Sequence, residues 1–145
     1  MRDPFERIWS EVRMNIKNKY PDQKNNEEFV CVKLLETYRL KGVEEKTRYE
    51  RMIKNLENVF DNQNIHYEFS ENLYSQQGLD RITNHLGMLS VIVDVNSPNP
   101  SPKMTVVPNE VKQEIVNFYK DTYISIFDKF GDDAKVLWNE SFKLL

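Results

Sequence analysis

The sequence predicts a mostly helical protein with one or two short strands. Several segments carry apolar residues at the three- and four-residue spacing of a helix with one buried face. Only one segment, 65–69, alternates apolar and polar residues as a half-buried strand does. The 145 residues contain no internal repeat and no linker long enough to separate two parts. A single domain over residues 1–145 is therefore expected.

The first helix is expected to begin at Pro4 and to end near Tyr20. Asp3 suits the N-cap, Pro4 suits the first helical position, and Glu6 can complete a capping box. The helix should end near Tyr20 because Pro21 disfavours helical conformation in the residue before it. One face is expected to be core, formed by Phe5, Ile8, Trp9, Val12 and Ile16.

Four later helices follow from the same spacing. They are expected at 27–40, 49–60, 79–86 and 108–130, and Gly42, Gly87 and Gly131 should end the first, third and fourth of them. The inward stripe of the long last helix is expected to be Val111, Ile115, Phe118, Thr122, Ile126 and Phe130. The core of the whole chain is expected to include Trp9, Ile53, Leu56, Tyr67, Phe118 and Trp138.

Extended structure is expected in two places. The alternating segment 65–69 predicts one short strand, and the apolar, β-branched segment 91–95 predicts a second extended stretch. The segment 96–102 holds three prolines and is expected to be an irregular loop. A lone strand cannot satisfy its own backbone donors and acceptors, so either the protein is nearly all helical or the sheet lies outside this chain.

Composition excludes several classes of function. The net charge of −3 and the pI of about 5.5 disfavour nucleic acid as the main partner. No apolar run approaches the roughly 18 residues of a membrane span, and the N-terminus lacks the apolar core of a signal peptide, so a cytoplasmic protein is expected. Cys31 cannot form an internal disulfide. His66 and His85 have no partner at metal-ligand spacing, so no metal site is expected.

The first ten residues could bind a phosphate group. Backbone amides at the start of a helix, together with its dipole, favour an anion. Arg2 stands beside that helix start and can bind phosphate oxygens through two parallel hydrogen bonds. Ser10 points away from the apolar face and can donate to the same anion. The alternative is a terminal arginine in solvent and an exposed helix serine.

Three segments resemble the sulfotransferases that use 3′-phosphoadenosine 5′-phosphosulfate (PAPS). Their 3′-phosphate motif reads R-[DN]-P-x-x-R-x-x-S after a strand, and it is matched here by Arg2, Asp3, Pro4, Arg7 and Ser10 in RDPFERIWSE. Residues 47–88 resemble the family's next block, with a tyrosine-led helix, a strand, an E-x-L turn and a short helix that ends in leucine-glycine. Residues 108–138 resemble the closing helix of the carbohydrate-type members.

The resemblance implies the C-terminal half of a P-loop-type α/β sulfotransferase fold. Family members also carry an N-terminal half with the loop for the 5′-phosphosulfate, usually the catalytic base, and most of a parallel sheet. The sequence has no G-x-x-K-[ST]-like loop, so that half is expected to be absent, and the chain to be truncated, split or degenerate. The missing half would then be a partner, and no catalytic residue is assigned.

The resemblance also implies a cofactor, a substrate class and a site. The cofactor is PAPS or adenosine 3′,5′-bisphosphate, and Arg2 and Ser10 are expected to bind its 3′-phosphate. Arg7 is a further candidate, which either contacts the nucleotide or forms a salt bridge. Lys103 is the cation in the loop that closes over the nucleotide in the family, or else a solvated loop lysine. A complete enzyme would transfer a sulfuryl group to a hydroxyl or amine of a carbohydrate-like or other small acceptor.

Two alternative functions remain open at this point. The chain could be a non-catalytic module that keeps a nucleotide- or partner-binding surface of that fold. It could also be a helix-turn-helix DNA binder, because residues 79–95 carry a glycine and flanking apolar positions in a similar order. The second helix of such a motif would carry Asp94 where a DNA-reading helix carries basic or amide side chains.

Overall fold

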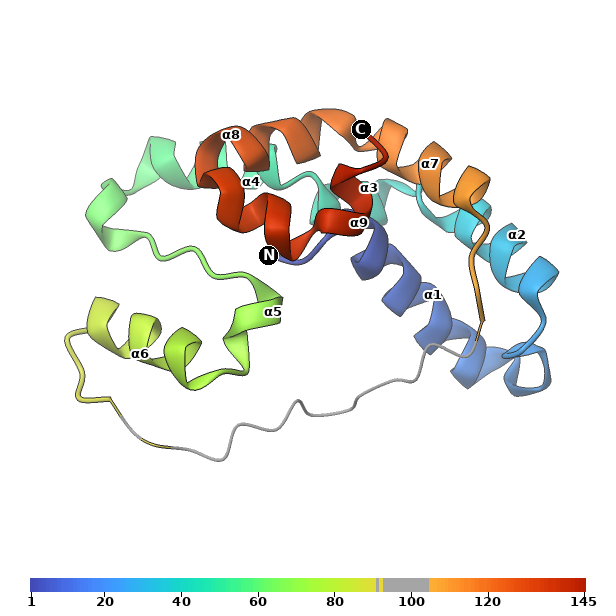
Figure 1. The fold of residues 1–145 in the computed structure, drawn as a ribbon, viewed down its shortest axis with the longest axis horizontal. Helices are drawn as coiled ribbons and strands as arrows, with labels where there is room; N and C mark the ends of the chain where they lie inside the picture. Colours follow the sequence, from blue (N-terminus) through green and yellow to red (C-terminus); the bar gives the residue numbers. More distant parts are fainter. Residues whose placement is uncertain (91, 93–104) are drawn as a thin grey trace. The chain divides into compact units, whose positions relative to one another are not determined.

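The computed structural model describes residues 1–90, 92 and 105–145, and the chain is mostly helical in these residues (Figure 1). The predicted helical character is thereby confirmed. The helices in chain order are α1 (Pro4–Lys19), η1 (Pro21–Gln23), α2 (Glu27–Thr37), α3 (Lys41–Thr47), α4 (Tyr49–Val59), η2 (Asn62–Asn64), α5 (Ser70–Leu73), α6 (Gln76–His85), α7 (Asn109–Phe118), α8 (Lys120–Leu137) and α9 (Asn139–Phe142). The predicted extended stretch at 91–95, apart from residue 92, and the predicted loop at 96–102 lie outside the described residues.

The chain divides into two compact units. The larger unit comprises Asp3–Met52 and Ser101–Leu145, and the smaller unit comprises Met1–Arg2 and Ile53–Pro100. Helix α4 begins in the larger unit and continues in the smaller one. Each unit has its own packing and its own polar network.

Helix α1 forms as the sequence predicts. The side chain of its N-cap Asp3 accepts a hydrogen bond from the backbone N–H of Glu6 at 3.2 Å, and Pro4 is its first residue. The helix ends at Lys19, directly before Tyr20 and Pro21. All five residues of the predicted apolar face are buried, namely Phe5, Ile8, Trp9, Val12 and Ile16. This face packs against α2 and α7, which lie beside α1 (Figure 1).

The prediction for the second helix is wrong at its C-terminal end. Helix α2 ends at Thr37 rather than near residue 40, and Gly42 lies inside the next helix, α3. The chain turns at Leu40, whose extended backbone (φ −62°, ψ 133°) is the N-cap of α3. The carbonyl of Leu40 accepts hydrogen bonds from the N–H groups of Val43 and Glu44 and so starts a new helix. Gly42 therefore does not act as a C-terminal cap.

The predicted last helix is two helices. Helix α7 ends at Phe118 and α8 begins at Lys120, while Tyr119 between them leaves helical geometry (φ −99°, ψ 17°). The fully buried Tyr119 hydroxyl donates to the carbonyl of Tyr38 at 2.6 Å, a contact that ties the break to the end of α2. The predicted break at Gly131 is confirmed (φ 63°, ψ −141°), although helical structure resumes beyond it and reaches Leu137.

The core of the larger unit is formed mainly by α1, α2, α7 and α8. Of the predicted inward stripe, Ile115, Thr122 and Ile126 are buried, while Val111, Phe118 and Phe130 are partly exposed. The predicted stripe omits four buried residues of the segment 108–130, namely Val116, Tyr119, Tyr123 and Phe127. Of the predicted core of the whole chain, Trp9, Ile53 and Trp138 are buried, and Leu56, Tyr67 and Phe118 are partly exposed.

The smaller unit contains the extended segment 65–69 followed by α5 and α6. The ammonium group of Met1 donates to the carbonyl of Glu68, and the N–H of Ser70 donates to the carbonyl of Met1 at 2.6 Å. These two bonds on either side of Phe69 have the pattern of a parallel strand pair. A strand needs a ladder of such bonds, and none of the described residues is in a strand. The predicted strand at 65–69 is therefore wrong, although its backbone is extended.

Helix α6 confirms the predicted short helix and its C-terminal cap, although it begins at Gln76 rather than near residue 79. The hydroxyl of its N-cap Ser75 accepts from the N–H of Gly78 at 3.0 Å and donates to the carbonyl of Asn72 at 2.7 Å. A Cβ atom on Gly78 would lie 2.1 Å from the Asn72 carbonyl oxygen, so only glycine fits where α6 meets α5. At the other end of α6, Gly87 has the positive φ of 65° that the predicted cap requires.

Candidate functional site

The backbone amides at the start of α1 are already bonded within the larger unit. Pro4 has no N–H, the N–H of Phe5 donates to the Tyr123 hydroxyl at 3.2 Å, and the N–H of Glu6 donates to the Asp3 carboxylate. The N–H of Arg7 donates to the carbonyl of Asp3 at 2.8 Å. The expectation that these amides donate to a phosphate is therefore wrong in this structure. Side chains must supply the donors of a phosphate site here.

Asp3 and Tyr123 form a buried pair beneath the start of α1. The Tyr123 hydroxyl donates to Asp3 Oδ1 at 2.9 Å, and Asp3 is 4% exposed. Burial raises the pKa of Asp3, an effect that the Ser141 and Tyr123 hydroxyls and the N–H of Glu6 partly offset. Burial and the nearby Asp3 carboxylate also raise the pKa of Tyr123 well above 10.0, so its hydroxyl keeps its proton and remains a donor. The pair fixes the geometry of the residues next to Arg2.

We expect Asp3→Asn to change how the stability of the chain depends on pH. The raised pKa means that the Asp3 contribution to stability is fully present below its usual value of 3.8 and is lost as the pH rises through the folded pKa. Asparagine is an equally good N-cap and has no charge to bury. Urea denaturation should therefore show that the variant is more stable than wild type by a larger free energy at pH 7 than at pH 3.5. An equal difference at both pH values would contradict the assignment of a raised pKa to Asp3.

Arg7 is held by contacts to α3 and to its own helix. Its Nε atom donates to Thr47 Oγ1 at 3.0 Å, and its Nη1 atom forms an ion pair with Glu11 Oε2 at 2.7 Å. Its Nη2 atom donates to the carbonyl of Val43 at 3.4 Å. These contacts favour the salt-bridge reading of Arg7 over direct contact with a nucleotide. Arg7 therefore joins α1 to α3.

The other predicted binding residues occupy different parts of the chain. Ser10 is partly buried on α1, three residues after Arg7 and on the same side of the helix. Arg2 is partly exposed and belongs to the smaller unit, whereas Ser10 belongs to the larger one. Lys103 lies outside the described residues. The structure thus places Arg7 and Ser10 on one helix, and it places Arg2 one residue before the N-cap of that helix.

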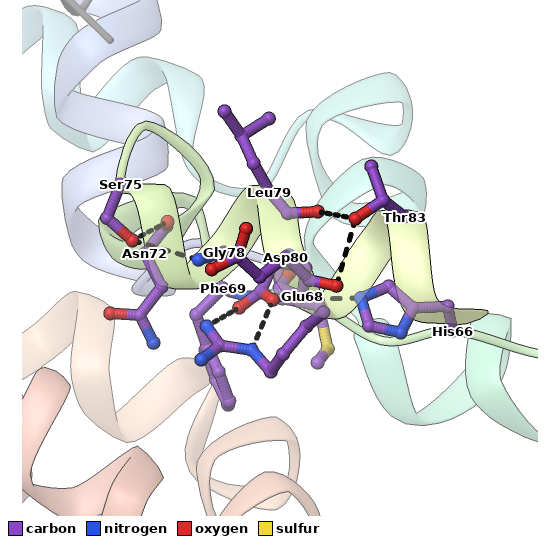
Figure 2. A network of polar contacts seen from close by, with 11 residues as sticks. His66, Glu68, Phe69, Asn72, Ser75, Gly78, Leu79, Asp80 and Thr83 are labelled. Carbon is purple, nitrogen blue, oxygen red and sulfur yellow. Dashed lines mark hydrogen bonds and ion pairs between the residues drawn. The ribbon is translucent and has the colours of Figure 1, made fainter. Parts of the chain in front are cut away.

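A second polar network surrounds Glu68 in the smaller unit (Figure 2). Arg81 binds both carboxylate oxygens of Glu68, with Nε–Oε2 at 2.9 Å and Nη2–Oε1 at 3.0 Å. His66 Nε2 lies 3.6 Å from Glu68 Oε2 (Figure 2), and the His66 and His85 rings are 5.2 Å apart. Burial opposes ionisation of Glu68, but Arg81, the N–H of Phe69 and His66 hold its pKa below the usual range. Glu68 is thus ionised, and its contacts with Arg81 join the extended segment 65–69 to α6.

No local sequence pattern predicts the network that Glu68 forms with Arg81 and His66. Glu68 and Arg81 are 13 residues apart and lie in different elements, and no local pattern pairs them. The two histidines come together in the structure, but no group of three or more potential metal ligands occurs among residues 1–90, 92 and 105–145. The carboxylate oxygens of Glu68 are already bonded to Arg81, so its clearest role is to hold the segment that pairs with Met1.

Comparison of the chain with protein-family models, with curated proteins and with solved structures finds no match. Within the described part of the chain, no helix has both the length and the apolar character needed to cross a membrane. The described residues 88–90 are not helical, so α6 is not followed directly by a second helix of a helix-turn-helix motif.

Proposed function

We propose that this chain binds the 3′-phosphate of PAPS or of adenosine 3′,5′-bisphosphate at the start of α1, as a sulfotransferase-like protein with the C-terminal half of that fold. The proposal is supported mainly by the order of the structural elements before and after Arg2. Met1 has the backbone pairing of a parallel strand, Arg2 follows it, and α1 begins at Pro4 with Asp3 as its cap. In the R-[DN]-P-x-x-R-x-x-S motif that the sequence resembles, the arginine likewise follows a strand.

Side chains rather than backbone amides would hold the phosphate. The guanidinium of Arg2 supplies the charge and can form two parallel hydrogen bonds with phosphate oxygens. The hydroxyl of Ser10 supplies a neutral donor from the second turn of α1, and the dipole of the helix adds a weaker attraction. Arg7 keeps its contacts to Thr47 and Glu11 and holds α1 in place. Lys103 remains a candidate for a further cationic contact.

The reaction of a complete enzyme would move a sulfuryl group from PAPS to a carbohydrate-like or other small acceptor. The acceptor oxygen or nitrogen would form a new bond to sulfur while the bond between sulfur and the bridging phosphate oxygen breaks. Adenosine 3′,5′-bisphosphate would leave, and the acceptor proton would pass to a base that is not assigned in this chain. No G-x-x-K-[ST]-like loop occurs in the sequence, an observation that favours a second candidate. That candidate is a module that binds the nucleotide without transferring the sulfuryl group.

Thermal unfolding in the presence of nucleotides tests the proposal. A ligand that binds only the folded chain raises the midpoint of unfolding in a concentration-dependent way. We expect adenosine 3′,5′-bisphosphate to raise the midpoint more than adenosine 5′-monophosphate does at the same concentration. Equal shifts, or no shift with either nucleotide, would contradict the proposed site. Transfer of radiolabelled sulfate from PAPS to a carbohydrate acceptor then separates the enzyme from the non-catalytic module.

A further inference from the structure

A cavity of about 180 Å³ lies between α1 and α2 in the larger unit. Its lining combines the buried apolar residues Val12 and Ile16 and the exposed ring of Tyr20 with four polar side chains, namely Asn15, Lys19, Lys33 and Thr37. An apolar cavity of about 150 Å³ is known to hold one benzene ring. The cavity between α1 and α2 has room for one six-membered ring, but it is open to solvent on one side, so a ring bound there would be only partly covered.

The lining of this cavity is positively charged. Lys19 and Lys33 both line it, and no carboxylate occurs among the described residues that do. The Lys33 ammonium lies 2.7 Å from Glu36 Oε2, 5.8 Å from the ring centre of Tyr20 and 5.4 Å from that of Phe29. A lysine ammonium has three donors, and Glu36 uses one of them. The rings and the ion pair thus orient Lys33 and leave donors for a ligand.

We propose that the cavity binds a small organic anion, namely a ring-sized apolar body that carries one carboxylate. The apolar body would contact the Tyr20 ring, which lines the cavity and is 46% exposed, and the carboxylate would accept hydrogen bonds from Lys19 and Lys33. The Thr37 hydroxyl would add a neutral donor. Lys19 lies in the last turn of α1, at the opposite end of the helix from Arg2, so this site goes beyond the proposed nucleotide site and does not depend on it.

Binding of benzoate to the full 145-residue chain tests this proposal. In ¹H–¹⁵N spectra, benzoate should cause saturable shifts of backbone amides in residues 12–20 and 33–37. Benzamide has nearly the same size without the charge, and it should bind about tenfold more weakly because it cannot form charge-assisted hydrogen bonds to lysine. Inorganic sulfate has charge without an apolar body and should cause no saturable shift at these residues. Equal affinity for benzoate and benzamide, or shifts elsewhere only, would overturn the proposal.

Substitutions separate the ligand contacts from general effects of charge. Lys33→Gln and Lys19→Gln should each weaken benzoate binding by about fivefold to tenfold. Lys17→Gln removes the same charge from an exposed position of the same helix turn, outside the cavity lining, and should leave the affinity unchanged. Glu36→Gln removes the carboxylate that competes for Lys33, so it should strengthen benzoate binding. Benzoate affinity that is the same in Lys33→Gln, Lys19→Gln and wild type would overturn the proposal.

Discussion

Replacing Trp138 by alanine will lower the free energy of unfolding of the larger unit by about 3–5 kcal/mol. Trp138 is 1% exposed, and its ring centre lies 6.0 Å from that of Tyr123, 6.1 Å from that of Phe127 and 6.4 Å from that of Tyr49. Alanine would leave a cavity among these rings, which come from α4 and α8 and cannot all move to fill it. Urea denaturation followed by circular dichroism measures the loss.

Val136→Ala is the matched control for Trp138→Ala. Val136 is two residues away in α8 and is 74% exposed, so its truncation should change the free energy of unfolding by less than about 0.5 kcal/mol. A loss below about 1 kcal/mol for Trp138→Ala would show that the aromatic cluster does not hold the larger unit together.

Replacing Arg2 by alanine will weaken binding of adenosine 3′,5′-bisphosphate by about tenfold to a hundredfold. Hydrogen bonds to a charged group contribute roughly 1.5–3 kcal/mol, which corresponds to this range of affinity. The first-turn amides of α1 are bonded to Asp3 and Tyr123, so they cannot replace the lost guanidinium. Ser10→Ala should cost less because its hydroxyl is uncharged and water can take its place. Calorimetric titration measures both losses.

Arg51→Ala is the control for the loss of one positive charge. The Arg51 side chain is 64% exposed and pairs with Glu44, and it takes no part in the proposed site. Its removal should leave the nucleotide affinity within about twofold of wild type. An equal loss of affinity in Arg2→Ala and Arg51→Ala would mean that the nucleotide responds to net charge alone.

Local signals in the sequence predicted α1 and α6 well because their determinants lie within a few residues. Asp3 and Pro4 begin α1, and Gly87 follows the end of α6, whereas the start of α6 at Gln76 was predicted three residues too late. The break between α7 and α8 is different. It coincides with the bond from Tyr119 to the carbonyl of Tyr38, which is 81 residues away in the sequence, so helical periodicity alone predicted one continuous helix. The wrong prediction of a strand at 65–69 has another cause. Alternation of apolar and polar residues indicates an extended backbone, but it does not show whether a second strand lies beside it.

The sequence predicted the start of α1 but not the groups that bond to its first-turn amides. Asp3, Pro4 and Glu6 predicted a capped helix, and the structure contains it, while the binding roles of Arg2 and Ser10 stay a prediction. The hydroxyl of Tyr123 accepts the hydrogen bond of the Phe5 N–H and donates to Asp3, which is 120 residues away in the sequence. No local sequence pattern predicts these two contacts. For the same reason the pairing of Glu68 with Arg81 appears only in the folded chain.

The affinity of the chain for two adenine nucleotides tests the central claim most directly. Adenosine 3′,5′-bisphosphate and adenosine 5′-monophosphate differ only in the 3′-phosphate that Arg2 and Ser10 are proposed to bind. In calorimetric titrations of the full 145-residue chain, we expect the bisphosphate to bind at least about tenfold more tightly. We expect Arg2→Ala to remove most of that difference. Equal affinity of the wild-type chain for both nucleotides would contradict the account and leave the first ten residues as a well-capped helix.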